Sequence, residues 1–284
     1  MQQIFSETGT FLLGLKKCDN TFLSVPAQFS EYTVLYIPEG KGIFTADFGV
    51  FPFTGPVLLF STPLQTIQLQ TNNDEISVLQ FHGDFYCIEY HREEVACNGL
   101  LFNNVYIDPV ISLSKAEAVF IEQLFGNISD ECLQNEVSEI VLRSYLQLFL
   151  AKATTIKRRL MANEEKAEPK DELMERFRLL LDEHYLTLHK PNDYAELLAV
   201  SPNTLTKRCT KYFKKPPTHI IAERLIMEAK RQLHLTRKSI KEIAFALNFQ
   251  DEFYFSRVFK KFTNVSPQAF RDKTGISIVA DLYR

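Results

Sequence analysis

The chain has 284 residues, of which 45% are hydrophobic and 24% are charged, a composition typical of a folded protein with room for two domains. No apolar run reaches the ~18 residues of a membrane span, and the first residues lack the basic start and long apolar core of a secretory signal, so we expect a cytoplasmic protein with no membrane partner. The five cysteines are scattered without paired spacing, which favours reduced thiols over a disulfide framework or a metal site.

The net charge of −3 conceals an uneven distribution along the chain. Residues 1–170 carry 12 Lys and Arg against 21 Asp and Glu, a net of −9, whereas residues 171–284 carry 20 against 14, a net of +6. Within residues 201–273 the count is 16 against 6, a net of +10. A basic carboxyl-terminal part joined to an acidic part is typical of a protein that contacts nucleic acid with one end only.

Residues 1–110 have the pattern of short β-strands. Runs rich in β-branched and aromatic residues recur at 32–37, 42–48, 57–61, 66–70 and 75–81. Stretches of Pro, Gly, Asn and Asp, which favour turns, separate these runs. Short strands at this spacing predict a small barrel or sandwich.

After Ser114 the hydrophobic period changes from that of strands to that of helices. The spacing predicts two amphipathic helices within residues 114–160, the first capped by Ser114 and the second running from about Glu136 to Leu160. Such a helix pair could cover an open face of the strands, or it could form a contact between two copies of the chain.

Residues 161–170, MANEEKAEPK, are polar and charged and contain no apolar stripe to bury. This composition predicts a linker. It would separate an amino-terminal domain at 1–160 from an all-helical domain at 171–284.

Residues 239–262 predict two helices joined by a tight turn. Ser239 can cap the first helix, and Glu242 completes a capping box. Asn248 tolerates the left-handed backbone that a tight turn requires, and Asp251 can cap the second helix. The second helix is apolar on one side and largely basic on the other, which is the arrangement of a helix-turn-helix whose recognition helix enters the DNA major groove.

This stretch closely resembles the second helix-turn-helix of the AraC/XylS family of transcription regulators. The shared positions keep their order and spacing, at Ile243-Ala244, Phe249, Asp251, Tyr254 to Arg257, Phe259 to Lys261, Ser266-Pro267 and Arg271. Asn248 and Asn264 stand where the family usually has Gly. Because Asn is the commonest replacement for Gly at positive φ, we expect both turns to be kept.

An internal repeat predicts a first helix-turn-helix at 192–213, with Ser201 as the cap of its second helix and Pro202 at the first helical position. A shift of 50 residues aligns Leu205 with Phe255, Thr206 with Ser256, Lys207 with Arg257, Lys211 with Lys261, Tyr212 with Phe262 and Pro217 with Pro267. Upstream of the turn, Tyr194-Ala195 aligns with Ile243-Ala244 at a shift of 49. Residues 218–235 carry apolar positions at helical spacing and predict a rigid connecting helix.

The outward residues of the two recognition helices match the base-reading positions of the family. They are Asn203, Thr206 and Lys207 in the first helix, and Glu252, Phe253, Ser256 and Arg257 in the second. Asn, Lys and Arg can pair with base edges in the major groove, Glu can accept from a cytosine amine, and Phe can pack on a thymine methyl group. For Lys207 and Arg257 the alternative is a phosphate contact alone, and for Glu252 it is stabilisation of a helix N-terminus.

Other basic residues of this domain are predicted to contact the DNA backbone, which supplies affinity without sequence information. They are Lys211, Lys214, Lys215, Lys260 and Lys261. Arg271 could bind a phosphate or could make a structural bond at the end of the domain.

The amino-terminal half shows no catalytic constellation. His82 and His91 are isolated, unlike the dense His and Glu set of a metal-binding cupin, and phosphate-loop and nucleophile-elbow motifs are absent. We therefore expect no enzyme activity, no cofactor and no metal. The many phenylalanines of this half could form only a core, or could line a pocket for a small apolar effector.

The resemblance implies an α+β chain with two domains: a cupin-like barrel at 1–110 with a helix pair at 114–160, then two helix-turn-helix units joined by a connecting helix. It further implies a homodimer that binds double-stranded DNA in two successive major grooves, RNA polymerase as a partner, and control by a small-molecule effector. The sequence leaves two alternatives open: a ligand-independent dimeric DNA-binding factor, and a cupin-type enzyme fused to a DNA-binding domain.

Overall fold

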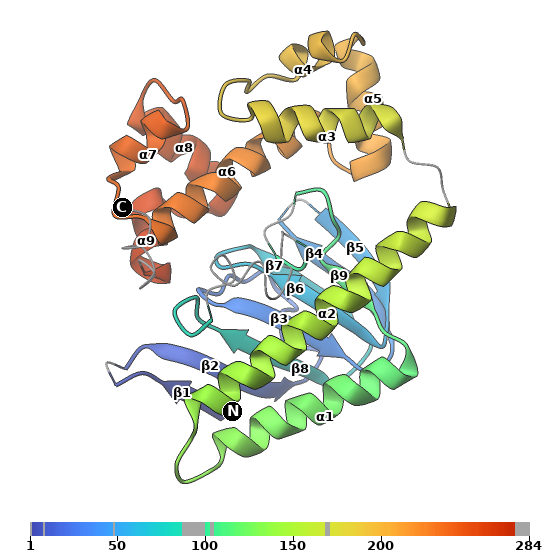
Figure 1. The fold of residues 1–284 in the computed structure, drawn as a ribbon, viewed down its shortest axis with the longest axis vertical. Helices are drawn as coiled ribbons and strands as arrows, with labels where there is room; N and C mark the ends of the chain where they lie inside the picture. Colours follow the sequence, from blue (N-terminus) through green and yellow to red (C-terminus); the bar gives the residue numbers. More distant parts are fainter. Residues whose placement is uncertain are drawn as a thin grey trace. The chain divides into compact units, whose positions relative to one another are not determined.

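The computed structural model describes residues 2–7, 9–47, 49–86, 100–102, 105–167 and 171–275. They fall into two compact units, one made of Met1–Asn104 with Asp108–Ala162 and the other of Val105–Ile107 with Asn163–Arg284. The amino-terminal part is rich in strands and the carboxyl-terminal part is helical, as the sequence predicts (Figure 1). Among the described helices, none is both long enough and apolar enough to cross a membrane.

The described strands of the first unit form two antiparallel sheets. The larger has six strands in the order β1-β2-β8-β3-β6-β9, and the smaller has the order β5-β4-β7. The strands are β1 (Gln2–Phe5), β2 (Phe11–Cys18), β3 (Tyr32–Ile37), β4 (Lys41–Ala46), β5 (Gly49–Thr54), β6 (Val57–Ser61), β7 (Ile67–Thr71), β8 (Ile76–Phe81) and β9 (Val110–Ser112).

The arrangement of the sheets refines the predicted barrel. Within the described residues, the two sheets pack face to face and their strands do not close into one ring. In β3, Leu35 and Ile37 pack toward the smaller sheet, whereas Val34 and Tyr36 pack on the opposite face. Because both faces are covered, β3 is buried along its whole length instead of alternating between buried and exposed residues.

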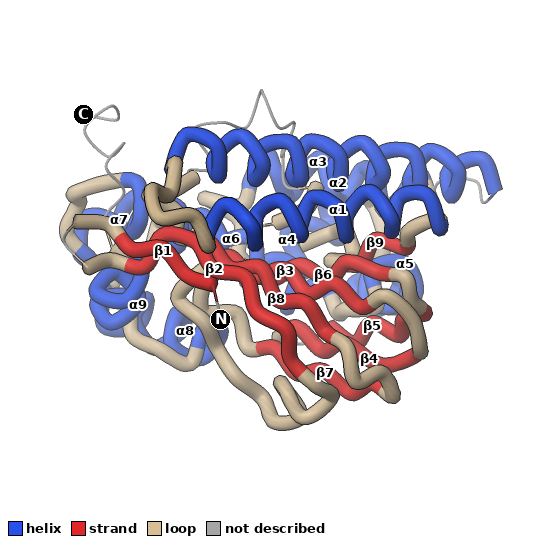
Figure 2. Tube along the Cα trace, turned by 90° about the horizontal axis from the view of Figure 1, so that it is seen from below, coloured by secondary structure: helices blue, strands red, loops and turns tan. Residues whose placement is uncertain are grey.

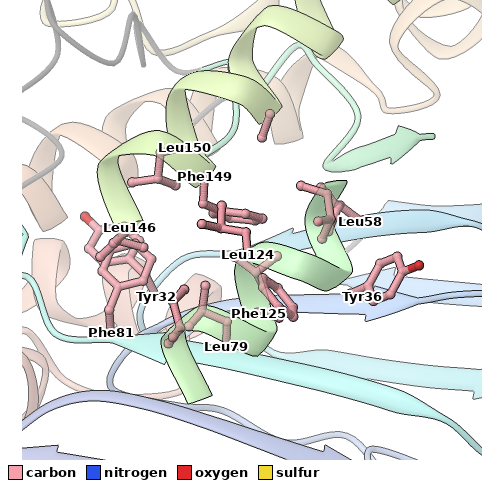
Figure 3. Close-up of a cluster of buried hydrophobic side chains, with 14 of the residues drawn as sticks. Tyr32, Tyr36, Leu58, Leu79, Phe81, Leu124, Phe125, Leu146, Phe149 and Leu150 are labelled. Atoms are coloured by element: carbon pink, nitrogen blue, oxygen red, sulfur yellow. The ribbon is translucent and has the colours of Figure 1, made fainter. Parts of the chain in front are cut away.

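Two helices cover the other face of the larger sheet, as Figures 2 and 3 show. They are α1 (Lys115–Cys132) and α2 (Glu139–Ala167). Figure 3 shows Phe125 and Phe149 from these helices beside Tyr32 and Phe81 from the sheet, and all four side chains are buried. The capping box at Ser114 confirms the predicted start of α1.

The boundary between the two units falls inside the predicted linker at 161–170, but the second helix ends later than the predicted Leu160, because α2 continues through Ala167. Met, Ala, Glu and Lys are strong helix formers, and extending an existing helix needs no new nucleus. A lack of apolar residues to bury is therefore not enough to end a helix. Residues 168–170 lie outside the described part of the chain.

The second unit contains two helix-turn-helix pairs joined by a connecting helix, α6 (Figure 1). α6 packs against α4 and α5 of the first pair and against α7, α8 and α9 on the other side. The helices are α3 (Glu172–His184), α4 (Pro191–Leu197), α5 (Pro202–Phe213), α6 (Pro217–Leu235), α7 (Ile240–Ala246), α8 (Glu252–Thr263) and α9 (Pro267–Thr274).

The two turns between paired helices are built alike. The Val200 N–H donates to the Ala195 carbonyl, and the Phe249 N–H donates to the Ala244 carbonyl, both at 2.9 Å. The residue before each donor is left-handed, with φ +55 at Ala199 and +60 at Asn248. The left-handed turn predicted at Asn248 is thus confirmed, and the first pair makes the same turn with an alanine.

We expect Ala199→Gly to raise the free energy of unfolding of the second unit by about 1 kcal/mol, since a Cβ costs about 1–2 kcal/mol in the left-handed region and glycine avoids that cost. Urea unfolding of the full chain, followed by hydrogen exchange of the α4 and α5 amides, would measure the change. Ala222→Gly, inside α6, is the matched control and should lower the free energy by about 1 kcal/mol. A loss of stability in both variants would contradict strain at Ala199.

Candidate nucleic-acid interface

The first recognition helix, α5, is held by its start and by its inner face. The Ser201 hydroxyl accepts from the Thr204 N–H at 3.1 Å, and Pro202 occupies the first turn. Leu205 and Cys209 are fully buried one helical turn apart. This inner pair fixes which side of α5 faces outward.

The predicted base-reading residues of α5 all lie on its exposed side. Asn203, Thr206 and Lys207 are exposed. The Thr206 hydroxyl donates to the Pro202 carbonyl at 2.9 Å, so in this rotamer its oxygen is free to act only as an acceptor. The Asn203 amide and the Lys207 ammonium supply the donors of this surface.

The second recognition helix, α8, repeats this construction with aromatic residues. Asp251 caps the helix, accepting from the Phe253 N–H at 3.1 Å and the Tyr254 N–H at 2.9 Å. Phe255 and Phe259 are fully buried and their rings are 5.9 Å apart. They occupy the positions that Leu205 and Cys209 hold in α5.

The outward side of α8 combines an aromatic side chain with a guanidinium. Phe253 is 68% exposed and Arg257 is exposed. The Arg257 guanidinium lies over the Tyr254 ring at 5.8 Å, a contact that limits the directions in which Arg257 can point. Glu252 and Ser256 are half-buried at the edge of this surface.

The five lysines predicted to contact the DNA backbone differ in their exposure to solvent. Lys211, Lys260 and Lys261 are exposed. Lys214 donates to the Lys211 carbonyl at 2.9 Å and has φ +58 at the end of α5.

Lys215 does not fit the predicted role. Its ammonium donates to Glu223 at 2.8 Å, and the two side chains are only 16% and 15% exposed. A phosphate contact would have to break this pair and leave a sheltered carboxylate without its cation, which is unfavourable. The sequence could not show this, because the partner lies on α6.

Arg271 makes the structural bond that the sequence left as one of two alternatives. Its guanidinium donates to the Leu233 carbonyl at 3.1 Å and to the Lys238 carbonyl at 2.6 Å. These carbonyls flank the junction between α6 and α7. Arg271 therefore ties α9 to the start of the second helix-turn-helix.

Sequence reasoning missed an ion pair that fixes α5 against α3. Asp171 caps α3 by accepting from the Leu173 and Met174 N–H groups, and its carboxylate also accepts from Arg208 on α5, with 2.8 Å to Nε. The hydrogen bond from Arg208 holds the pKa of Asp171 below its ordinary value. An Asp just before apolar residues at helical spacing indicates a helix cap, but nothing in the sequence identifies Arg208 as the ion-pair partner of Asp171.

The amino-terminal unit contributes no recognisable metal centre in its described part. Nδ1 of His82 accepts from the Asp84 N–H at 3.2 Å, which makes it an acceptor within its own turn. His91 lies outside the described residues. Over the ranges that the structure describes, no three His, Cys, Asp or Glu side chains gather as metal ligands would.

Comparison with known proteins places the match on the two helix-turn-helix pairs. The model of a helix-turn-helix domain family matches residues 194–273. The raffinose operon transcriptional regulatory protein RafR of Pediococcus pentosaceus is 23% identical over 254 residues, which cover 87% of this chain and 86% of that protein.

Solved structures resemble the chain more loosely. ToxT from Vibrio cholerae O395 shares 16% identity over 93% of this chain and 95% of that chain, with a TM-score of 0.40. The C-terminal domain of AraT, a response regulator from Geobacillus stearothermophilus, shares 27% identity over 39% of this chain and 93% of that chain, with a TM-score of 0.37. Both scores are low and carry no weight for function.

The family match spans both turns, both recognition helices and the connecting helix α6. It coincides with the residues that carry the AraC/XylS resemblance and with the basic part of the sequence. Residues 194–273 are therefore similar to a helix-turn-helix domain family, and the chain as a whole is similar to a transcriptional regulatory protein.

Proposed function

We propose that the chain binds specific DNA sequences by inserting α5 and α8 into successive major grooves, which lie about 34 Å apart along one face of the duplex. The observation that carries the proposal is the duplicated construction of the two pairs: a capped recognition helix, two buried inner residues and a left-handed turn before it. Both pairs are packed on α6, which would hold the two recognition helices at one spacing.

The side chains on the outward sides of α5 and α8 divide into two proposed roles. Side chains that can pair with base edges are proposed to read sequence, and they are Asn203, Thr206, Lys207, Glu252, Phe253, Ser256 and Arg257. Exposed lysines near the ends of α5 and α8 are proposed to contact DNA phosphates. They are Lys211, Lys260 and Lys261, with Lys214 as a further candidate. Arg271 and Lys215 are left out because their cations are held inside the domain.

The test is DNA binding by the full chain, using a duplex that the wild-type chain selects from a random-sequence library. Fluorescence anisotropy across a series of salt concentrations should show affinity that falls linearly with the logarithm of salt, because bound lysines displace counterions. A chain that selects no sequence and shows no salt-sensitive binding would refute the proposal.

Arg257→Ala and Lys261→Ala should separate the two roles. Loss of a base contact at Arg257 should cost about 1–3 kcal/mol at one base position and relax the preference there, whereas loss of Lys261 should weaken binding to every sequence and reduce the salt slope by about one. Affinities for a panel of single-base variants of the selected duplex would measure both effects. Equal losses on all sequences for Arg257→Ala would contradict its base-reading role.

We also propose that the chain dimerises through the outer side of the α1–α2 pair. The inner sides of these helices cover the sheet, yet apolar side chains remain exposed on the pair and on the loop between its helices. They are Val119, Leu133, Val137, Ile140 and Leu148. Exposed apolar residues gathered on one element are typical of an interaction surface.

Sedimentation velocity should show a dimer for the wild-type chain and a monomer for Ile140→Glu, since Ile140 is 78% exposed and a carboxylate there would have to be buried at the interface. Val25→Glu is the matched control, because Val25 is 70% exposed but lies away from both helices, between β2 and β3. A wild-type monomer at all concentrations would remove this part of the proposal.

We further propose that the amino-terminal unit binds a small-molecule effector between its two sheets, and that the effector controls how the DNA-binding domains act on RNA polymerase. Three buried polar residues lie side by side across β8, β3 and β6, on the face toward the smaller sheet: Gln80, Thr33 and Ser61. The Gln80 amide donates to the Thr33 hydroxyl at 3.1 Å. Polar groups in an apolar layer are what a small ligand needs for orientation.

A thermal-shift screen of the full chain should find a metabolite that raises the melting temperature, because a ligand bound only by the folded state stabilises it. Raffinose and other sugars are the first probes, given the name of the relative described above. Gln80→Leu should abolish the shift, and Gln70→Leu, at an exposed position of β7, should keep it. No shift with any metabolite favours the ligand-independent factor, and metal-dependent turnover favours the enzyme.

A further inference from the structure

A short segment from the amino-terminal part of the sequence belongs to the DNA-binding unit. Val105–Ile107, which we call the strap, is grouped with residues 163–284 and not with the strands around it in sequence. Val105 is only 9% exposed and joins the hydrophobic cluster of the first helix-turn-helix, with Met174, Phe177 and Leu205 among its members.

Tyr106 makes the specific contacts of the strap. Its ring centroid lies 5.8 Å from that of Phe213, the last residue of α5. The Tyr106 hydroxyl donates to Oδ1 of Asp182 at 3.2 Å. This Asp182 oxygen also accepts from Nε of Arg224 at 2.9 Å. Burial, followed by the nearby Asp182 charge, raises the pKa of Tyr106 well above its ordinary value, so the phenol remains a donor.

A comparison of the two helix-turn-helix pairs explains why the first pair would need the contact with Tyr106. The residue that corresponds to Phe213 in the second pair is Thr263, which is buried and satisfies its own hydroxyl by donating to the Phe259 carbonyl at 2.8 Å. Phe213 instead places a ring at the end of α5, where Phe177, Tyr212 and Tyr106 surround it. Loss of Tyr106 would remove one of these three ring contacts, at a cost set by the apolar area that it covers.

We propose that Tyr106 is a positioning residue for DNA recognition, and that it holds the carboxyl-terminal end of α5 so that the first recognition helix keeps its angle. The inference rests on the proposed function, because the angle matters only if α5 enters DNA. It assigns a role in DNA binding to a residue that lies outside the matched helix-turn-helix segment.

The test compares Tyr106→Ala and Tyr106→Phe with the wild-type full chain on the selected duplex. Tyr106→Ala should weaken binding about tenfold, the size of a typical coupling between sites. Hydroxyl-radical footprinting should show the loss in the half-site assigned to α5 by Lys207→Ala, with the α8 half-site retained. Tyr106→Phe should lose less in the same half-site, since it keeps the ring and removes only the bond to Asp182.

The matched control is Tyr36→Phe in the first unit. This variant removes a similar hydrogen bond, from the Tyr36 hydroxyl to the Glu122 carboxylate at 2.6 Å, and it should leave the footprint unchanged. If Tyr106→Ala does not fold, Tyr106→Phe decides, because an unchanged α5 half-site in that variant overturns the inference. Equal weakening of both half-sites by a folded Tyr106→Ala overturns it as well.

Hydrogen exchange of the DNA-free chain separates this inference from the proposed function. The α5 amides should exchange faster in Tyr106→Ala than in the wild type, whether or not DNA binds, because local opening is measured without a ligand. A wild-type chain that binds no DNA would sink the proposed function. Unchanged hydrogen exchange of the α5 amides in Tyr106→Ala would refute the positioning role of Tyr106.

Discussion

The geometry of the two helix-turn-helix pairs depends on one left-handed residue in each turn. Ala199 and Asn248 reverse the backbone between the first helix of a pair and its recognition helix, and the same carbonyl-to-amide bond closes both turns. A recognition helix leaves its turn in a direction that the turn sets, and the buried inner residues then fix which side of the helix faces outward. Asparagine tolerates this backbone at little cost, whereas alanine carries the strain of its Cβ.

The two pairs share a backbone plan but differ in how they are supported. The first has Ala199 and Lys214 at its left-handed positions, where the second has Asn248 and Asn264. The first also ends its recognition helix with Phe213 in place of Thr263. It also has two additional contacts, the Asp171–Arg208 ion pair and the contact of the strap with Phe213. The second pair instead has a capping box at its first helix, and Arg271 of α9 donates to the Leu233 and Lys238 carbonyls before that helix.

In the amino-terminal unit, a strand buried on both faces connects the two layers of core. β3 contributes to the cluster under α1 and α2 and to the cluster between the sheets. This leaves little room for polar residues, and the buried row on β8, β3 and β6 is therefore a notable exception. Satisfied buried polar groups tolerate little rearrangement, so a ligand there would compete for the bond between Gln80 and Thr33.

Features that depend on neighbours in the chain could be predicted from the sequence alone. Caps at Ser114, Ser201, Ser239 and Asp251, the left-handed turn at Asn248, and the helical period of the carboxyl-terminal domain are local properties, and local backbone chemistry decides them. The repeat was also readable, because it compares the sequence with itself.

Contacts between groups that are distant in sequence depend on the packing of the whole domain and could not be predicted in this way. β5 was missed because Gly49 and Pro52 weaken a strand signal, yet proline is tolerated at the edge of a sheet, and β5 is an edge strand. The sequence predicts a DNA backbone contact for Lys215, and only the packing of the helices shows that its ammonium pairs with Glu223 on α6. The strap could not be recognised, since no local pattern shows that Tyr106 packs against a recognition helix more than a hundred residues later. Such contacts depend on how the chain folds back on itself, which periodicity and propensity do not encode.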